Sequence, residues 1–141
     1  MPKKIHKLNL EPEYSFKLIG ISSHENDYRL SWAINNKLRI ELNKTTDLEI
    51  LNRKFSERQN FSLHTYEDED TFIKYNLLSN TCDNGFLIEE MKNIDFFLQV
   101  FGEVPDSFIE NLNQRLKLID VITASFIIDP NNLKSKLKLI Y

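Results

Sequence analysis

The chain of 141 residues has a single cysteine, Cys82. Without a second thiol it can form neither an internal disulfide nor a cysteine-based zinc site, which is typical of proteins in a reducing compartment. No apolar run is long enough to cross a bilayer, and no apolar stretch of the signal-peptide kind follows the basic N-terminus. We therefore expect a cytoplasmic protein that is not inserted in a membrane.

Glycine and proline are also scarce, with three and four residues respectively. Few glycines leave few places for a phosphate-cradling loop, and no P-loop or dinucleotide-binding glycine motif is present. No serine lies in a G-x-S-x-G elbow, and His6, His24 and His64 lack metal-site spacing, so we interpret them as surface or capping residues. We predict no catalytic residue, no metal site and no cofactor, although an active site need not leave a local signature.

The net charge of −3 disfavours nucleic acid as a partner, since nucleic-acid-binding domains concentrate positive charge. Lysines nevertheless gather near both ends of the chain, at positions 3, 4 and 7 and at positions 134, 136 and 138. If the two ends were neighbouring strands, these lysines would form a basic stripe suited to RNA. The favoured interpretation is that they protect exposed strand edges from pairing.

Composition favours one globular domain over residues 1–141. Hydrophobic residues make up 41% of the chain and charged residues 28%, which is close to globular averages. A chain of this length can bury a core without disulfides or metals, and no linker or internal repeat divides it.

The apolar pattern alternates between strand and helix periods. Strands are predicted at 4–10, 15–22, 38–42, 48–51, 60–66, 71–78, 95–102 and 121–128. A helix is predicted over 24–36, with Ser22 and Glu25 as a capping box, and a second helix begins near Pro105. An acidic hairpin loop spans 67–70, a second loop spans 80–85, and the tail from 131 to 141 has room for a helical turn and a short edge strand.

Because hairpin-length loops dominate, the predicted fold class is α+β. We expect a mostly antiparallel sheet of about six to seven strands with two helices packed on one face.

The first helix carries two aromatic residues and an arginine close together. Tyr28 and Trp32 are spaced i,i+4, and Arg29 lies beside them. These residue types are enriched at the energetic centres of protein interfaces. The same pattern is also typical of core packing with a peripheral arginine.

Residues 88–96, with the sequence IEEMKNIDF, resemble the motif that names the IPExxxVDY family of uncharacterised bacterial proteins. Ile88, Glu90 and Asp95 match the motif, whereas Glu89 replaces its proline, Ile94 its valine and Phe96 its tyrosine. The segment DYRLSWAIN at 27–35 and the ending LKSKLKLIY resemble the family as well. The resemblance implies one domain and no known activity, and it directs attention to Glu90 and Asp95.

Three hypotheses for the function follow. The first is a non-catalytic module that binds another protein through Tyr28, Arg29 and Trp32, with Glu90 and Asp95 as further candidate partner- or ligand-binding residues. The second is a small-molecule site or enzyme in a pocket between sheet and helices, near His24, Arg29 or Asp95. The third is RNA binding through the terminal lysines. The oligomeric state stays open.

Overall fold

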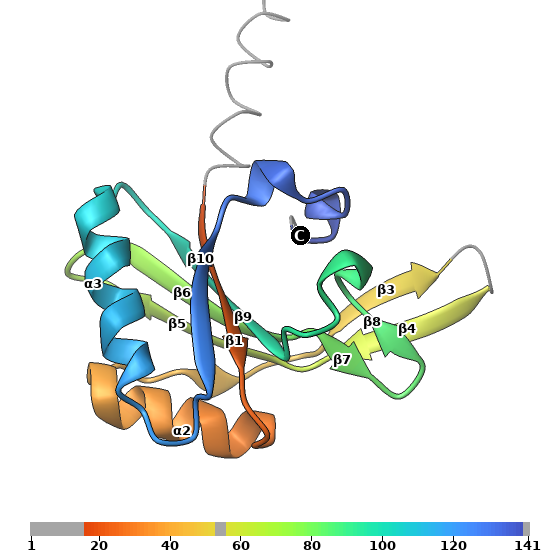
Figure 1. The fold of residues 1–141 in the computed structure, drawn as a ribbon, viewed down its shortest axis with the longest axis horizontal. Coiled ribbons are helices and arrows are strands. Elements are labelled where there is room, and N and C mark those ends of the chain that lie inside the picture. The colour runs from red at the N-terminus through yellow and green to blue at the C-terminus, as the bar shows by residue number, and fades with distance from the viewer. Residues whose placement is uncertain (1–15, 53–55, 140–141) are drawn as a thin grey trace, which may run out of the picture.

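The computed structural model describes residues 16–52 and 56–139, and it confirms the α+β class. The main sheet has six strands in the order β10-β1-β9-β6-β5-β2, with every neighbouring pair antiparallel (Figure 1). Its strands are β1 (Lys17–Ser22), β2 (Asn43–Lys44), β5 (Leu63–Asp68), β6 (Ile73–Ser79), β9 (Phe96–Phe101) and β10 (Ala124–Ile128). Two small sheets pair β3 (Leu48–Asn52) with β4 (Glu57–Phe61), and β7 (Thr81–Cys82) with β8 (Gly85–Phe86). The strand predicted at 4–10 lies outside the described residues.

Both helices pack on one face of the main sheet, as predicted. Helices α2 (Asp27–Leu38) and α3 (Asp106–Lys117) lie together on one side of it (Figure 1). Each directs apolar residues spaced three or four apart toward the strands. Their buried side chains share one core with alternate strand residues, among them Leu30, Ile34, Leu112, Leu116, Ile19, Ile21, Leu77 and Leu98. Among the residues described, no helix has the length and apolarity needed to span a bilayer.

The opposite face of the sheet is covered by irregular segments. Strand residues such as Leu18 and Phe97 point to this side, because successive side chains of a strand alternate between the two faces. The cover comes from the β3–β4 hairpin, from the stretch before β9 and from the C-terminal segment. The 3-10 turns in these segments are η1 (Glu89–Met91), η2 (Pro130–Asn132) and η3 (Lys136–Leu139).

A buried asparagine organises the stretch before β9. Asn80 is fully buried, and its side-chain nitrogen donates to the carbonyls of Met91 and Ile94 at 3.0 and 2.8 Å. Its side-chain oxygen accepts from the backbone N–H of Ile88 at 2.7 Å. These three bonds provide hydrogen-bond partners for backbone groups of residues 88–94, a segment that does not pair with a neighbouring strand.

The start of α2 differs from the predicted capping box. The N-cap is Asn26, whose side-chain oxygen accepts from the backbone N–H of Arg29 at 2.9 Å, and the helix begins at Asp27. Ser22 is instead the last residue of β1, and its hydroxyl donates to the carbonyl of Asn93. The predicted capping box of Ser22 and Glu25 is therefore wrong. Asn26 caps the helix instead, and asparagine is as good an N-cap residue as serine.

The strand predicted at 38–42 is wrong, although the alternating pattern is real. Helix α2 continues to Leu38 and ends at Arg39, which has a left-handed backbone with φ 58°. The backbone N–H and carbonyl of Leu42 bond with the side-chain amide of Asn35 at 2.8 and 3.1 Å. A side chain thus takes the place of a neighbouring strand.

Other predicted boundaries change as well: β5 continues through Glu67 and Asp68 of the predicted acidic loop, and β10 begins at Ala124 instead of 121. The predicted strand at 60–66 is two strands, because the chain leaves the β3–β4 sheet at Phe61 and enters the main sheet at Leu63. The loop at 80–85 contains the small β7–β8 hairpin. In the tail the described residues form the turns η2 and η3 and no edge strand.

Candidate functional site

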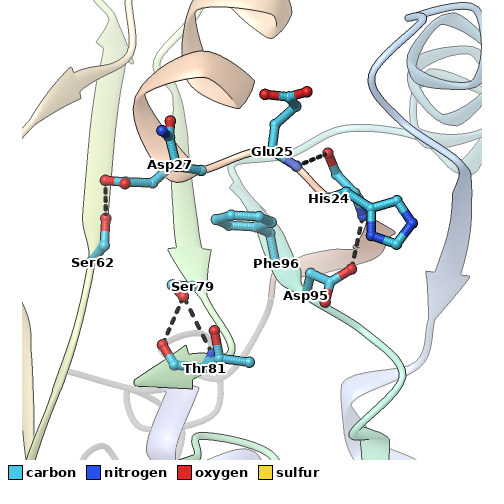
Figure 2. Close-up of a pocket in the computed structure, with 10 residues that line it drawn as sticks. His24, Glu25, Asp27, Ser62, Ser79, Thr81, Asp95 and Phe96 are labelled. Atoms are coloured by element: carbon cyan, nitrogen blue, oxygen red, sulfur yellow. Dashed lines mark hydrogen bonds between the residues drawn. The ribbon is translucent and has the colours of Figure 1, made fainter. Parts of the chain in front are cut away.

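A polar pocket of about 420 Å³ opens where β1 leads into α2. Residues 23–27 and Ser62 line it, together with Ser79, Thr81 and the start of β9 (Figure 2). All of these segments meet at one end of the main sheet. Asp95 and His24, two residues that the pocket hypothesis named, are among the lining residues, whereas Arg29 is not.

The pocket has an acidic lining. Glu25, Asp27 and Asp95 supply three carboxylates, and no lysine or arginine is among the lining residues. In Figure 2 the Phe96 ring is drawn between the Asp27 and Asp95 side chains. The pocket therefore suits a polar or positively charged group better than an anion.

Asp27 is the centre of a hydrogen-bonded cluster at one side of the pocket. Its Oδ2 accepts from the Ser62 hydroxyl at 2.5 Å and lies 2.9 Å from His64 Nε2. The His64 side chain is only 3% exposed, so its interpretation as a surface or capping residue is wrong. As the first residue of α2, Asp27 also benefits from the positive end of the helix dipole.

These contacts keep Asp27 ionised at neutral pH. Burial raises the pKa of its carboxyl, but hydrogen bonds from Ser62 and then His64, together with the charge of His64, lower it by more. The net result is a pKa below the ordinary value of 3.8. A negative charge therefore persists at this wall of the pocket.

The cluster is not arranged for nucleophilic catalysis. In a serine hydrolase the histidine stands between serine and aspartate, so that it can remove the hydroxyl proton. Here Asp27 takes the middle position, and the Ser62 hydroxyl donates to a carboxylate. Among the described residues no group of three metal-ligating side chains comes together either.

Asp95 anchors the opposite wall of the pocket. Its Oδ2 accepts from the backbone N–H of Ser23 at 2.8 Å, which ties the residue before β9 to the residue after β1. The Ser23 hydroxyl donates to the carbonyl of Val121 at 2.6 Å and so extends this link. None of the ion pairs between described residues includes Asp95.

The aromatic pair of α2 lies on the surface. Tyr28 is 62% exposed and Trp32 is 66% exposed, so the core-packing interpretation does not hold for these rings. Arg29 is exposed beside them and forms an ion pair with Glu25 at 3.5 Å. We call Tyr28, Arg29 and Trp32 the aromatic face.

The aromatic face and the pocket adjoin each other. The Tyr28 ring meets the His64 ring edge-on, with centroids 5.5 Å apart and planes at 86°. His64 in turn lies against Asp27, which lines the pocket. Four of the five residues named from the sequence thus lie in the pocket or in the adjoining aromatic face. They are Asp95, which lines the pocket, and Tyr28, Arg29 and Trp32.

Glu90 lies elsewhere and binds the C-terminal segment. Its carboxylate accepts from the backbone N–H groups of Lys134 and Ser135 at 2.6 and 3.2 Å, and from the Ser135 hydroxyl at 2.9 Å. Burial raises the pKa of this carboxyl, but a hydrogen bond from the backbone of Glu90 itself, followed by those from Ser135 and Lys134, lowers it by more. The geometry describes a clamp between η1 and the chain that follows η2.

Most of the terminal lysines lie outside the part of the chain that the structure describes, so the predicted basic stripe is not tested. Positions 3, 4 and 7 and the Lys136 side chain lie outside what the structure describes. The ammonium group of Lys138 donates to the carbonyl of Leu87 at 3.1 Å. RNA binding through these lysines stays a prediction.

No protein family model matches the chain, and a search of curated proteins found no match either. The resemblance to the IPExxxVDY family therefore stays a prediction. Within that motif, Ile88 and Ile94 are buried in the second core, and the two acidic residues make the clamp and the Ser23 contact.

Sequence reasoning missed the cluster of Asp27, Ser62 and His64. One available signal was the spacing of Ser62 and His64 within the run predicted as one strand at 60–66, because residues two apart on a strand share a face. In the structure Ser62 lies between β4 and β5. Nothing local places Asp27 against them, since it precedes Ser62 by 35 residues.

Proposed function

We propose that this chain is a non-catalytic cytoplasmic binding module, and that it binds another protein through the aromatic face. The observation that carries the proposal is the exposure of Tyr28 and Trp32 on a helix that buries Leu30, Ile34 and Leu38. Two large rings beside an arginine are the composition found at interface hot spots.

The energetic argument is the apolar area that these rings expose to water. Burying a whole tyrosine or tryptophan side chain removes roughly 150–250 Å² of surface from solvent, at about 25 cal/mol per Å² of apolar area. Of these surfaces, 62% for Tyr28 and 66% for Trp32 is still exposed. A partner that covered both rings would gain several kcal/mol, more than a rim contact supplies. The rings also enter an interface with few rotatable bonds to immobilise.

Co-purification with matched variants tests the proposal. Wild-type chain, a Tyr28→Ser/Trp32→Ser double variant and a Leu118→Ser control would each be used as bait. Leu118 is 68% exposed and lies at the C-cap of α3, so its substitution removes a surface hydrophobe elsewhere.

The expected result is a specific protein that the wild type and the control retain and the double variant loses. The isolated pair should then bind in calorimetry, with an affinity at least about tenfold weaker for the double variant. Equal binding by all three chains would contradict the proposal.

A second candidate is a small-molecule site in the polar pocket. The observation in its favour is a hollow of about 420 Å³ at which carboxylates and hydroxyls converge. A thermal-shift screen of polar metabolites tests it, with Asp95→Asn as the variant. A compound that stabilises the wild type and not the variant would support this candidate, and a screen without such a compound would argue against it.

A further inference from the structure

Resting on the proposed function, we propose that the partner inserts a cationic side chain, arginine or lysine, into the polar pocket while its neighbouring apolar residues cover Tyr28 and Trp32. The aromatic face would supply contact area, and the pocket would select the charge. The argument uses the continuity of the two surfaces, the charge of the pocket and its size.

Continuity comes from the first turn of α2. Asp27 lines the pocket, and the next residue, Tyr28, begins the aromatic face. From β5, His64 contacts both of them, through a 2.9 Å bond to Asp27 and an edge-on contact with the Tyr28 ring. A partner segment of a few residues can therefore reach both surfaces at once.

No lysine or arginine is paired with Asp27 or Asp95 among the described residues. Arg29, the nearest lysine or arginine in sequence, is paired with Glu25 on the helix surface. Asp27 has histidine and serine partners, and Asp95 takes part in none of the ion pairs among the described residues. Two acidic residues thus line the pocket without a lysine or arginine paired to either, and His64 is the basic partner of Asp27.

The helix N-terminus acts in the opposite direction. It contributes about half a positive charge, which by itself would attract an anion. The N-cap side chain of Asn26 already satisfies one of its free N–H groups. Although Glu25 is paired with Arg29, the carboxylates of Asp27 and Asp95 outweigh half a charge. The sign of the pocket is therefore negative, which makes phosphate the natural opposing probe.

Size and shape favour a flat or extended cation. A hollow of about 420 Å³ admits a guanidinium group together with part of its aliphatic stem. Arginine presents donors in a planar fork that matches a carboxylate, and lysine presents one compact charge. The Phe96 ring, which lines the pocket and is only 6% exposed, offers the stem a small apolar contact.

Amide chemical shifts of the full chain test the charge. The probes are N-acetyl-argininamide, its neutral isostere N-acetyl-citrullinamide, and inorganic phosphate, at up to about 50 mM because a single contact binds weakly. We expect the arginine probe to shift the amides of residues 23–27 and Asp95, and citrulline to shift them at least about fivefold less.

Asp95→Asn is the decisive variant. Its amide oxygen can still accept from the Ser23 N–H, so the loop is retained while the charge is removed. We expect it to weaken the arginine probe about tenfold, whereas Glu89→Gln, an exposed neutralisation on η1, leaves binding unchanged. Equal shifts from citrulline, shifts from phosphate alone, or no shifts at all would overturn the proposal.

A tripeptide amide, acetyl-Leu-Arg-Leu, separates this inference from the proposed function. It should bind more tightly than N-acetyl-argininamide, and the Tyr28→Ser/Trp32→Ser variant should lose that gain while it keeps the response to the single residue. If the pocket binds the arginine probe but the tripeptide gains nothing, the site serves a free cationic metabolite and the docking proposal is wrong. If the aromatic face captures a protein but the pocket ignores arginine, only the present inference fails.

Discussion

The two faces of the main sheet are covered in different ways. On one face, α2 and α3 place regularly spaced apolar residues against the strands. On the other face, a hairpin, short 3-10 turns and the C-terminal segment cover an equally buried set that includes Phe61, Phe97 and Leu139. Both faces bury hydrophobic residues, but only the first is covered by α-helices.

The difference shows what an irregular cover requires. A helix satisfies its own backbone hydrogen bonds, whereas a loop over a core needs other partners for its N–H and C=O groups. Buried polar side chains supply them on the second face. Asn80 bonds to the stretch before β9, and Gln99 donates to the carbonyl of Leu139 at 2.8 Å.

Asparagine substitutions on the two faces should therefore differ in cost. Asn80→Ala leaves the Ile88 N–H and the Ile94 carbonyl without partners, whereas the Met91 carbonyl still accepts from the Ile94 N–H, so we expect a loss of about 2–3 kcal/mol in the free energy of unfolding. Asn113→Ala on α3 removes one bond, from the Ser125 hydroxyl at 2.6 Å, and should cost about 1 kcal/mol.

Urea unfolding followed by circular dichroism measures both values. Similar losses for Asn80→Ala and Asn113→Ala would show that the second face does not depend on its buried amide. The comparison between the two faces would then reduce to hydrophobic packing alone.

The contribution of Asp27 to stability on the helix face should depend on pH. Its pKa is lower in the folded chain than the ordinary 3.8, so its contribution to stability is present above pH 3.8 and is lost as the pH falls through the folded pKa. Asp27→Asn should cost about 1–2 kcal/mol at pH 7. The difference between variant and wild type should shrink in acid, as measured by unfolding at pH 7 and pH 3. A difference that stayed constant with pH would contradict the ionised cluster with Ser62 and His64.

Glu90 is the corresponding test on the second face. Glu90→Gln weakens charge-assisted bonds to the backbone of Lys134 and Ser135, so we expect a loss of about 1 kcal/mol. Hydrogen exchange should accelerate at those two amides, and Glu89→Gln next to it should leave both unchanged. Unaltered exchange in Glu90→Gln would mean that the clamp does not hold the C-terminal segment.

The smallest expected change is at Arg39, where a substitution should raise the stability instead of lowering it. It adopts φ 58° at the end of α2, a conformation that glycine reaches without strain. Arg39→Gly should therefore raise stability by about 0.5–1 kcal/mol, whereas Asn36→Gly inside the same helix should lower it by a few tenths or more. Thermal unfolding distinguishes the two, and a destabilised Arg39→Gly would show that the arginine side chain outweighs its backbone strain.

Much of the helix face could be predicted from the sequence. Leu112 and Leu116, spaced four apart on α3, lie in the core, and the apolar run predicted as a strand at 95–102 forms β9, which is central in the sheet. These elements have strong local periods, which reflect the surface they bury. The strand predicted at 38–42 failed because a side-chain amide, that of Asn35, replaced the ladder that alternation usually indicates.

The candidate site was predicted only in part. Tyr28, Arg29 and Trp32 were identified by residue type, but their exposure depends on which side of α2 meets the sheet. His64 was misassigned because strand alternation gives two faces and does not say which one a helix covers. Its contact with Asp27 joins segments 37 residues apart, and no local pattern encodes such a distance.

By itself the sequence determined the α+β class, the two amphipathic helices and the absence of familiar catalytic motifs, because each follows from residue types and short-range spacing. Only the tertiary structure decided that irregular segments cover the second face and that the first turn of α2 meets β5 beside a pocket. Those arrangements depend on contacts between residues remote in the chain, and their free energy comes from burial that exists only once the sheet has formed.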